Sequence, residues 1–175
     1  MTTGTIDFEA DHFSWREEGG GVSAANHCLA FLAEVGIEVG PLGDHEAQLL
    51  EGLAIINGRL LIYPDTPVWP GDLLHEAGHI AVAAPQDRKT LGPVDPDGAD
   101  EMAAIAWSYA AAQACGVGLE QLFHDGGYRG DSASLRAAFA NGSYIGAPML
   151  GFFGLTDPDG HDGDHPFPAM IRWLR

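Results

Sequence analysis

The chain has 175 residues, 46% of them hydrophobic, which suits one globular domain spanning residues 1–175 with a buried core. Asp and Glu number 25 against 8 Lys and Arg, so the formal net charge at pH 7 is −17. Such an acidic surface repels nucleic-acid phosphates and anionic lipids, and we therefore expect neither a nucleic-acid partner nor a membrane partner.

The cysteines and the first residues bear on localisation. Cys28 and Cys115 belong to no CxxC pattern, which favours two buried, reduced thiols. The opening MTTGTIDFEADHF is acidic where a secretory signal needs a basic start and an apolar stretch. Together these features predict a cytoplasmic protein. The uncharged run over residues 102–119 is Ala-rich and contains polar residues, so it predicts a buried helix rather than a membrane span.

The first half of the chain predicts a helix, a hairpin and a second helix. Ser23 can cap a helix over residues 24–35, which Gly36 ends, and a short strand can follow over residues 37–39. The pair Asn57-Gly58 is typical of a hairpin turn, because both turn positions need positive φ. The hairpin strands would cover residues 53–56 and 59–63.

Proline marks the next helix, and the second half of the chain is helical too. Pro70 suits the first turn of a helix over residues 71–84, which Pro85 closes. An exposed loop is then expected over residues 85–98. Further helices are predicted over residues 99–115, 119–124 and 132–140, with a short helix ending in IRWLR. Residues 145–155 form a further apolar segment, whose pattern does not distinguish helix from strand. The whole pattern predicts a mostly helical α+β domain with a small sheet.

The segment HEAGH, residues 75–79, carries the chemistry. Positions four apart lie on one face of a helix, so His75 and His79 can present two imidazoles to one metal ion. Glu76 is offset by one position and can reach a metal-bound water without ligating the metal, as a general base does. Gly78 costs a helix about 1 kcal/mol relative to Ala, which indicates a close approach of another segment there.

A hydrolytic zinc ion usually takes three protein ligands, and Glu101 is the best candidate for the third. It begins the helix after HEAGH, which would pack on the HEAGH helix through Ala103, Ala104 and either Ile105 or Trp107. Asp100 is an alternative about 100° away around the same helix, and Asp97 is another in the preceding loop. We expect Zn²⁺ as the cofactor, although two His and a carboxylate also accept iron or manganese.

The pattern resembles a known family of enzymes. An HExxH followed by a helical Glu is similar to the gluzincin branch of zinc metallopeptidases. The order NGRLLIYPDTPVWPGDLLHEAGHIAV, then ADEMAAIAWSYA, resembles the small ImmA/IrrE-type peptidases. The resemblance covers about residues 53–110 and implies a zincin-like fold, with His75, His79 and Glu101 as ligands and Glu76 as the base. No helix-turn-helix segment accompanies it, and the last 60 residues match nothing in that family.

Two further features of the sequence are a set of side chains that could stabilise an oxyanion and an acidic segment near the C-terminus. Zincins usually add a side chain that stabilises the oxyanion, and the candidates are His124, Tyr128, Arg129, Tyr109 and Tyr144. The segment DPDGHDGDH, residues 157–165, departs from the EF-hand pattern at several positions, so we interpret it as a solvated acidic loop.

Two functional hypotheses follow. The first is a zinc-dependent hydrolase, a metallopeptidase acting on a peptide or protein substrate, with Glu76 activating the water. The second is a catalytically inactive, metal-stabilised interaction protein that retains the helix pair. The sequence leaves the substrate and the oligomeric state open.

Overall fold

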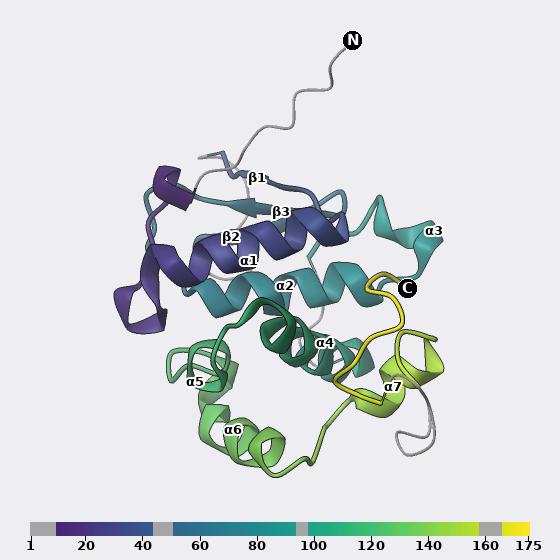
Figure 1. Cartoon of the computed structure of the whole chain (residues 1–175). Coiled ribbons are helices and arrows are strands. Elements are labelled where there is room, and N and C mark those ends of the chain that lie inside the picture. Colours follow the sequence, from purple (N-terminus) through teal and green to yellow (C-terminus); the bar gives the residue numbers. More distant parts are fainter. Residues whose placement is uncertain (1–9, 44–50, 94–97, 158–165) are drawn as a thin grey trace.

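The computed structural model describes residues 10–43, 51–93, 98–157 and 166–175 (Figure 1). The predicted hairpin is confirmed. Strand β2 (Leu53–Ile56) pairs antiparallel with β3 (Arg59–Ile62), and Asn57 and Gly58 have φ values of 52° and 71° at the turn. Strand β1 (Val39–Pro41) forms two residues later than expected and pairs parallel with β3, giving the order β1-β3-β2.

The two helices of the first half lie beneath this sheet (Figure 1). Helix α1 (Gly21–Val35) begins earlier than predicted, with Gly20 rather than Ser23 at its N-cap, and ends at Gly36 as expected. Helix α2 (Pro70–Val82) has Pro70 in its first turn. The predicted loop after it is partly wrong, because Pro85 starts a short helix α3 (Pro85–Arg88) instead of only closing α2.

The second half of the chain covers the other side of α2 (Figure 1). Helix α4 (Ala99–Cys115) has the predicted bounds and ends at Gly116. Shorter elements follow it: α5 (Leu119–Leu122), the 3₁₀ turn η3 (Tyr128–Gly130), α6 (Ser132–Ala140) and α7 (Ala147–Phe152). Two more 3₁₀ turns, η1 (Ala10–His12) and η2 (Glu17–Gly19), precede α1. The fold is thus a mostly helical α+β arrangement with a small three-stranded sheet.

The predicted helix at IRWLR is wrong. Residues 166–175 run without regular secondary structure along α2 and α4. The backbone N–H of Arg175 donates to Ala81 O at 3.0 Å, and the Trp107 indole N–H donates to Trp173 O at 2.9 Å. The Arg175 N–H and the Trp173 carbonyl thus bond to neighbouring helices instead of within the segment, so tertiary contacts override the local pattern.

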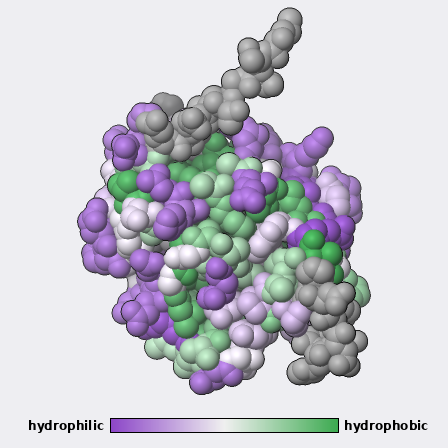
Figure 2. Space-filling view, in the orientation of Figure 1, coloured by the Kyte–Doolittle hydropathy of each residue, from purple (hydrophilic) through white to green (hydrophobic). Residues whose placement is uncertain are grey.

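One hydrophobic core joins the sheet, α1, α2 and α4. Its largest buried side chains include Trp107, Phe123 and Phe139. On the face shown in Figure 2, hydrophobic residues run between hydrophilic ones, so the surface there is not uniformly charged. Within the described residues, no helix is long and apolar enough to cross a membrane.

Candidate metal centre

Helix α2 presents two imidazoles on one side. His75 and His79 are one helical turn apart, and their ring centroids lie 5.0 Å from each other. Both residues are buried, with exposed fractions of 8% and 4%. Helix α2 is buried along almost its whole length, so both imidazoles lie inside the packed core rather than on an exposed helix face.

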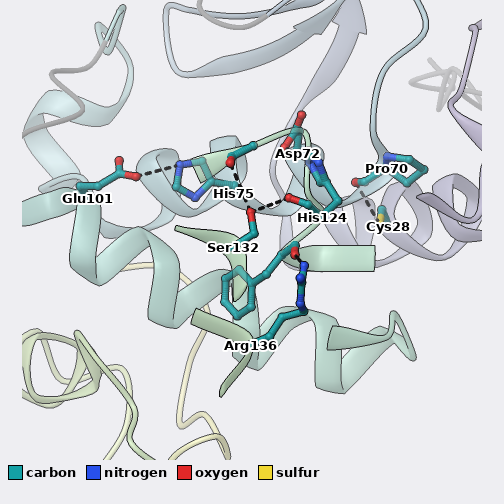
Figure 3. Close-up of polar contacts among 10 residues, drawn as sticks. Cys28, Pro70, Asp72, His75, Glu101, His124, Ser132 and Arg136 are labelled. Atoms are coloured by element: carbon teal, nitrogen blue, oxygen red, sulfur yellow. Dashed lines mark hydrogen bonds and ion pairs between the residues drawn. The ribbon is translucent and has the colours of Figure 1, made fainter. Parts of the chain in front are cut away.

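Helix α4 brings a carboxylate to the two rings. Glu101 Oε1 lies 3.2 Å from His75 Nε2, and Glu101 Oε2 lies 3.0 Å from His79 Nε2 (Figure 3 shows the His75 contact). One ligand atom from each of the three residues lies within 4.8 Å of the others. Among the described residues, this is the sole group of three His, Cys, Asp or Glu side chains that could hold a metal ion.

The spacing of these atoms fits a small cation. With ligand distances of about 2.0–2.1 Å, neighbouring ligand atoms of a tetrahedral zinc ion stand about 3.3 Å apart. The two nitrogen–oxygen distances of 3.2 and 3.0 Å are close to that separation. The same separation suits hydrogen bonds, so the three groups are arranged to share either protons or a metal ion.

A close contact between backbones makes this arrangement possible. Helices α2 and α4 pack on each other, as expected from the sequence, and no other two helices among the described residues contact each other as extensively. A Cβ atom built on Gly78 would lie 2.7 Å from Ala104 O. Only glycine lets α4 approach so closely, and the predicted approach at Gly78 is therefore confirmed.

The pKa values of Glu101 and His75 are shifted by the hydrogen bonds within the cluster. Burial raises the pKa of Glu101, but the hydrogen bonds from His75 and His79 outweigh this effect and hold that pKa at about 2. Burial lowers the pKa of His75, whereas the hydrogen bond to Glu101 and the nearby carboxylates raise it above its usual value overall. Without a metal ion, the carboxylate is thus ionised and stabilises protonated imidazole.

Glu76 lies in the same buried region and is not one of the three clustered side chains. Its exposed fraction is 4%, and its Oε2 atom has no hydrogen-bond partner within the described residues. Burial is the largest influence on its pKa, which is raised above the usual value. An unpaired carboxylate oxygen beside three candidate ligands is placed to accept a proton from a small molecule such as water.

A strained loop puts Tyr128 against His75. Tyr128 and Arg129 have φ values of 56° and 52°, a left-handed conformation that is uncommon for two successive residues other than glycine. The Tyr128 ring meets the His75 ring edge-on, with centroids 5.3 Å apart. Its buried hydroxyl lies beside Ser108 without a well-formed hydrogen bond, and burial raises its pKa well above the usual value. Tyr128 therefore remains a proton donor.

His124 is held in place nearby by an acid and an aromatic ring. Its Nε2 atom lies 2.8 Å from Asp72 Oδ1 (Figure 3). Its ring stacks on the Trp69 ring at a centroid distance of 4.1 Å. Its other nitrogen, Nδ1, is buried without a hydrogen-bond partner among the described residues. Sequence reasoning missed Asp72 and Trp69, although Asp72 lies one turn before His75 on the same helix.

The remaining sequence candidates lie elsewhere. Tyr109 and Tyr144 contact each other with tilted rings, whose centroids are 5.6 Å apart, in an aromatic cluster with Phe139 and Phe167. Asp100 is exposed and is not part of the His75, His79 and Glu101 group. Asp97 and most of the acidic segment 157–165 lie outside the described residues.

Comparison with known proteins gives no independent assignment. No protein family, no curated protein and no solved structure matches this chain.

Proposed function

We propose that the chain is a zinc-dependent hydrolase of the gluzincin kind, a metallopeptidase that cleaves a peptide or protein substrate. The observation that carries the proposal is the convergence of His75, His79 and Glu101 beside the unpaired carboxylate oxygen of Glu76. Two imidazoles and one carboxylate, with a base that is not a ligand, are the donor set of catalytic zinc sites. We extend the proposal to the small ImmA/IrrE-type peptidases, which residues 53–110 resemble.

Each residue then has a role that its surroundings support. His75, His79 and Glu101 would hold the ion, which when bound supplies a Lewis acid and lowers the pKa of a water molecule to about 7. Glu76 would accept a proton from that water, since its raised pKa favours the protonated form, and would pass the proton to the leaving amine. Tyr128 would donate its hydroxyl hydrogen to the carbonyl oxygen of the substrate.

Composition supports the partners and the compartment in this proposal. The net charge of −17 disfavours nucleic acids and anionic membranes as partners. The two free cysteines suit a reducing compartment, and we include the cytoplasm in the proposal on that ground.

The burial of the site favours one alternative function, that of a metal-stabilised interaction protein. His75, Glu76 and His79 are each less than a tenth exposed, which suits a metal ion that stabilises the helix pair in an interaction protein without turnover. The zinc site is common to both functions, whereas the role of Glu76 differs between them.

The variant Glu76→Gln separates the two functions. The zinc-loaded protein should cleave members of a mixed library of fluorogenic peptides, and Glu76→Gln should reduce that cleavage by about 10²–10⁴-fold while keeping the metal content unchanged. The exposed Glu34→Gln variant on α1 is the matched control and should cleave as the native protein does. Equal cleavage by Glu76→Gln and the native protein would contradict the proposed role of Glu76. No cleavage by the native zinc-loaded protein would favour the interaction protein.

A further inference from the structure

The turn that leads into Tyr128 lies against two stacked rings. The Trp69 and His124 rings are parallel to within 3°, with centroids 4.1 Å apart. A Cβ atom built on Gly126 would lie 2.9 Å from Trp69 Nε1, and one built on Gly127 would lie 3.0 Å from His124 Cε1. Gly127 is extended, with a φ of −126°, a conformation that any residue adopts. Glycine is required there by the close approach of the turn to this ring pair.

The ring pair is fixed to α2 and to the start of α6. Trp69 directly precedes α2, and His124 Nε2 lies 2.8 Å from Asp72 Oδ1 in the first turn of that helix (Figure 3). The hydroxyl of Ser132, the first residue of α6, lies 2.6 Å from His124 O and 3.2 Å from Gly127 O. His124 is only 3% exposed, so packing leaves its ring little freedom to move away from the turn.

The position of Tyr128 depends on this turn. Its φ of 56° is strained for a residue other than glycine and persists only where the surroundings impose it. Its hydroxyl has no well-formed hydrogen bond among the described residues, so the hydroxyl does not anchor the side chain. The ring lies against Phe123 and His75, at centroid distances of 5.2 and 5.3 Å. Because Gly127 is the preceding residue, a shift of the turn away from the ring pair would carry Tyr128 away from His75.

We propose that Trp69 and His124 are positioning residues, which place the Tyr128 hydroxyl for peptide hydrolysis. This inference rests on the proposed function of the site. Neither ring would touch the reacting atoms, since each acts through the glycine turn. A donor is effective only at about 2.7–3.1 Å from the developing oxyanion, so a displacement of Tyr128 by about 1 Å should reduce turnover by about 10²-fold. The start of α2 would thus set the places of both the ligand His75 and the proton donor.

Fluorine NMR of the full-length protein tests the positioning without zinc or substrate. The four tyrosines are replaced by 3-fluorotyrosine, and Tyr128→Phe identifies the Tyr128 resonance. The double variant Gly126→Ala/Gly127→Ala adds two methyl groups between the turn and the ring pair, and His124→Ala removes one ring.

We expect both variants to shift the Tyr128 resonance and to make it broaden when a soluble gadolinium chelate is added. The control Gly92→Ala, where a Cβ atom would meet nothing within 4 Å, should leave the resonance unchanged. A Tyr128 resonance that stays unchanged in the folded double variant, or in folded His124→Ala, would overturn the proposal.

Kinetics of the zinc-loaded protein link the positioning to turnover. The double variant should lower kcat by about 10²-fold with KM nearly unchanged, because the donor acts only in the transition state. In a Tyr128→Phe background, the same two alanines should lower kcat by less than about twofold further. A further loss of about 10²-fold in that background would contradict action through Tyr128. A native protein that cleaves no peptide would contradict the proposed function, whereas the fluorine measurement would still decide whether the ring pair holds Tyr128.

Discussion

Gly78 and Ala104 bring the backbones of α2 and α4 into direct contact. A Cβ atom on Gly78 would lie 2.7 Å from the carbonyl oxygen of Ala104 and 3.1 Å from its Cα. On α2, the contact lies one residue before His79. On α4, it lies about one helical turn after Glu101, which is in the first turn of that helix. The distance between the helices, and therefore the geometry of the candidate site, depends on the absence of a side chain at this position.

The variant Gly78→Ala should push the two helices apart. We expect a loss of about 1–3 kcal/mol in the free energy of unfolding, because the new methyl group meets backbone rather than a flexible side chain. Zinc affinity should fall at least tenfold, since the ligands come from both helices. Denaturant unfolding and zinc titration measure the two effects. The control is Gly92→Ala, where a Cβ atom would meet nothing within 4 Å and stability should change by less than about 0.5 kcal/mol.

The variant Tyr128→Phe should lower turnover without harming the fold. The hydroxyl has no well-formed hydrogen bond, so its removal should change the free energy of unfolding by less than about 1 kcal/mol. If the hydroxyl donates to the substrate carbonyl, kcat should fall by about 10²–10³-fold with the metal content unchanged. Tyr144→Phe, in the aromatic cluster with Tyr109, is the control and should retain full turnover. Equal kcat values for the two variants would rule out Tyr128 as the donor.

The stability of the metal-free protein and the stability of the zinc-loaded protein should change with pH in opposite directions. The pKa of Glu101 is about 2 in the metal-free fold, so its contribution to stability is complete above its usual pKa and is lost as the pH falls toward 2. The pKa of His75 is raised, so its contribution is present below its usual pKa and is lost as the pH rises through the raised value. The metal-free protein should therefore be most stable at mildly acidic pH.

Zinc reverses this trend because it binds only neutral imidazole. The gain in thermal midpoint on adding zinc should grow as the pH rises through the raised pKa of His75. Thermal unfolding of zinc-loaded and EDTA-treated protein across about pH 4–9 measures both trends. A gain that stayed constant over this range would show that zinc does not compete with protons for the His75 imidazole.

The sequence predicted the elements whose signals are local. The Asn57-Gly58 turn and the Gly36 and Gly116 helix ends are confirmed, because each depends on positive φ at one or two positions. The clustering of His75, His79 and Glu101 could be anticipated because two lie on one helix and the third begins the next. That these residues bind zinc stays a prediction.

The features that sequence reasoning missed depend on contacts between distant segments. His124 meets Asp72 across 52 positions, and no local pattern predicts that pair. The helix expected at IRWLR failed for the same reason, because the Arg175 N–H and the Trp173 carbonyl bond to Ala81 and Trp107 of neighbouring helices instead of within the segment. Long-range contacts of this kind become visible only once the helices are packed.

The most direct test of the proposed function is the metal content of the untagged protein, measured by elemental mass spectrometry beside Glu101→Ala and the exposed control Asp100→Ala. The proposal predicts about one zinc ion per native chain, the same in Asp100→Ala, and a sharp loss in Glu101→Ala. No metal in the native protein, even after zinc is added back, would contradict it and leave the three side chains as a buried hydrogen-bonded cluster.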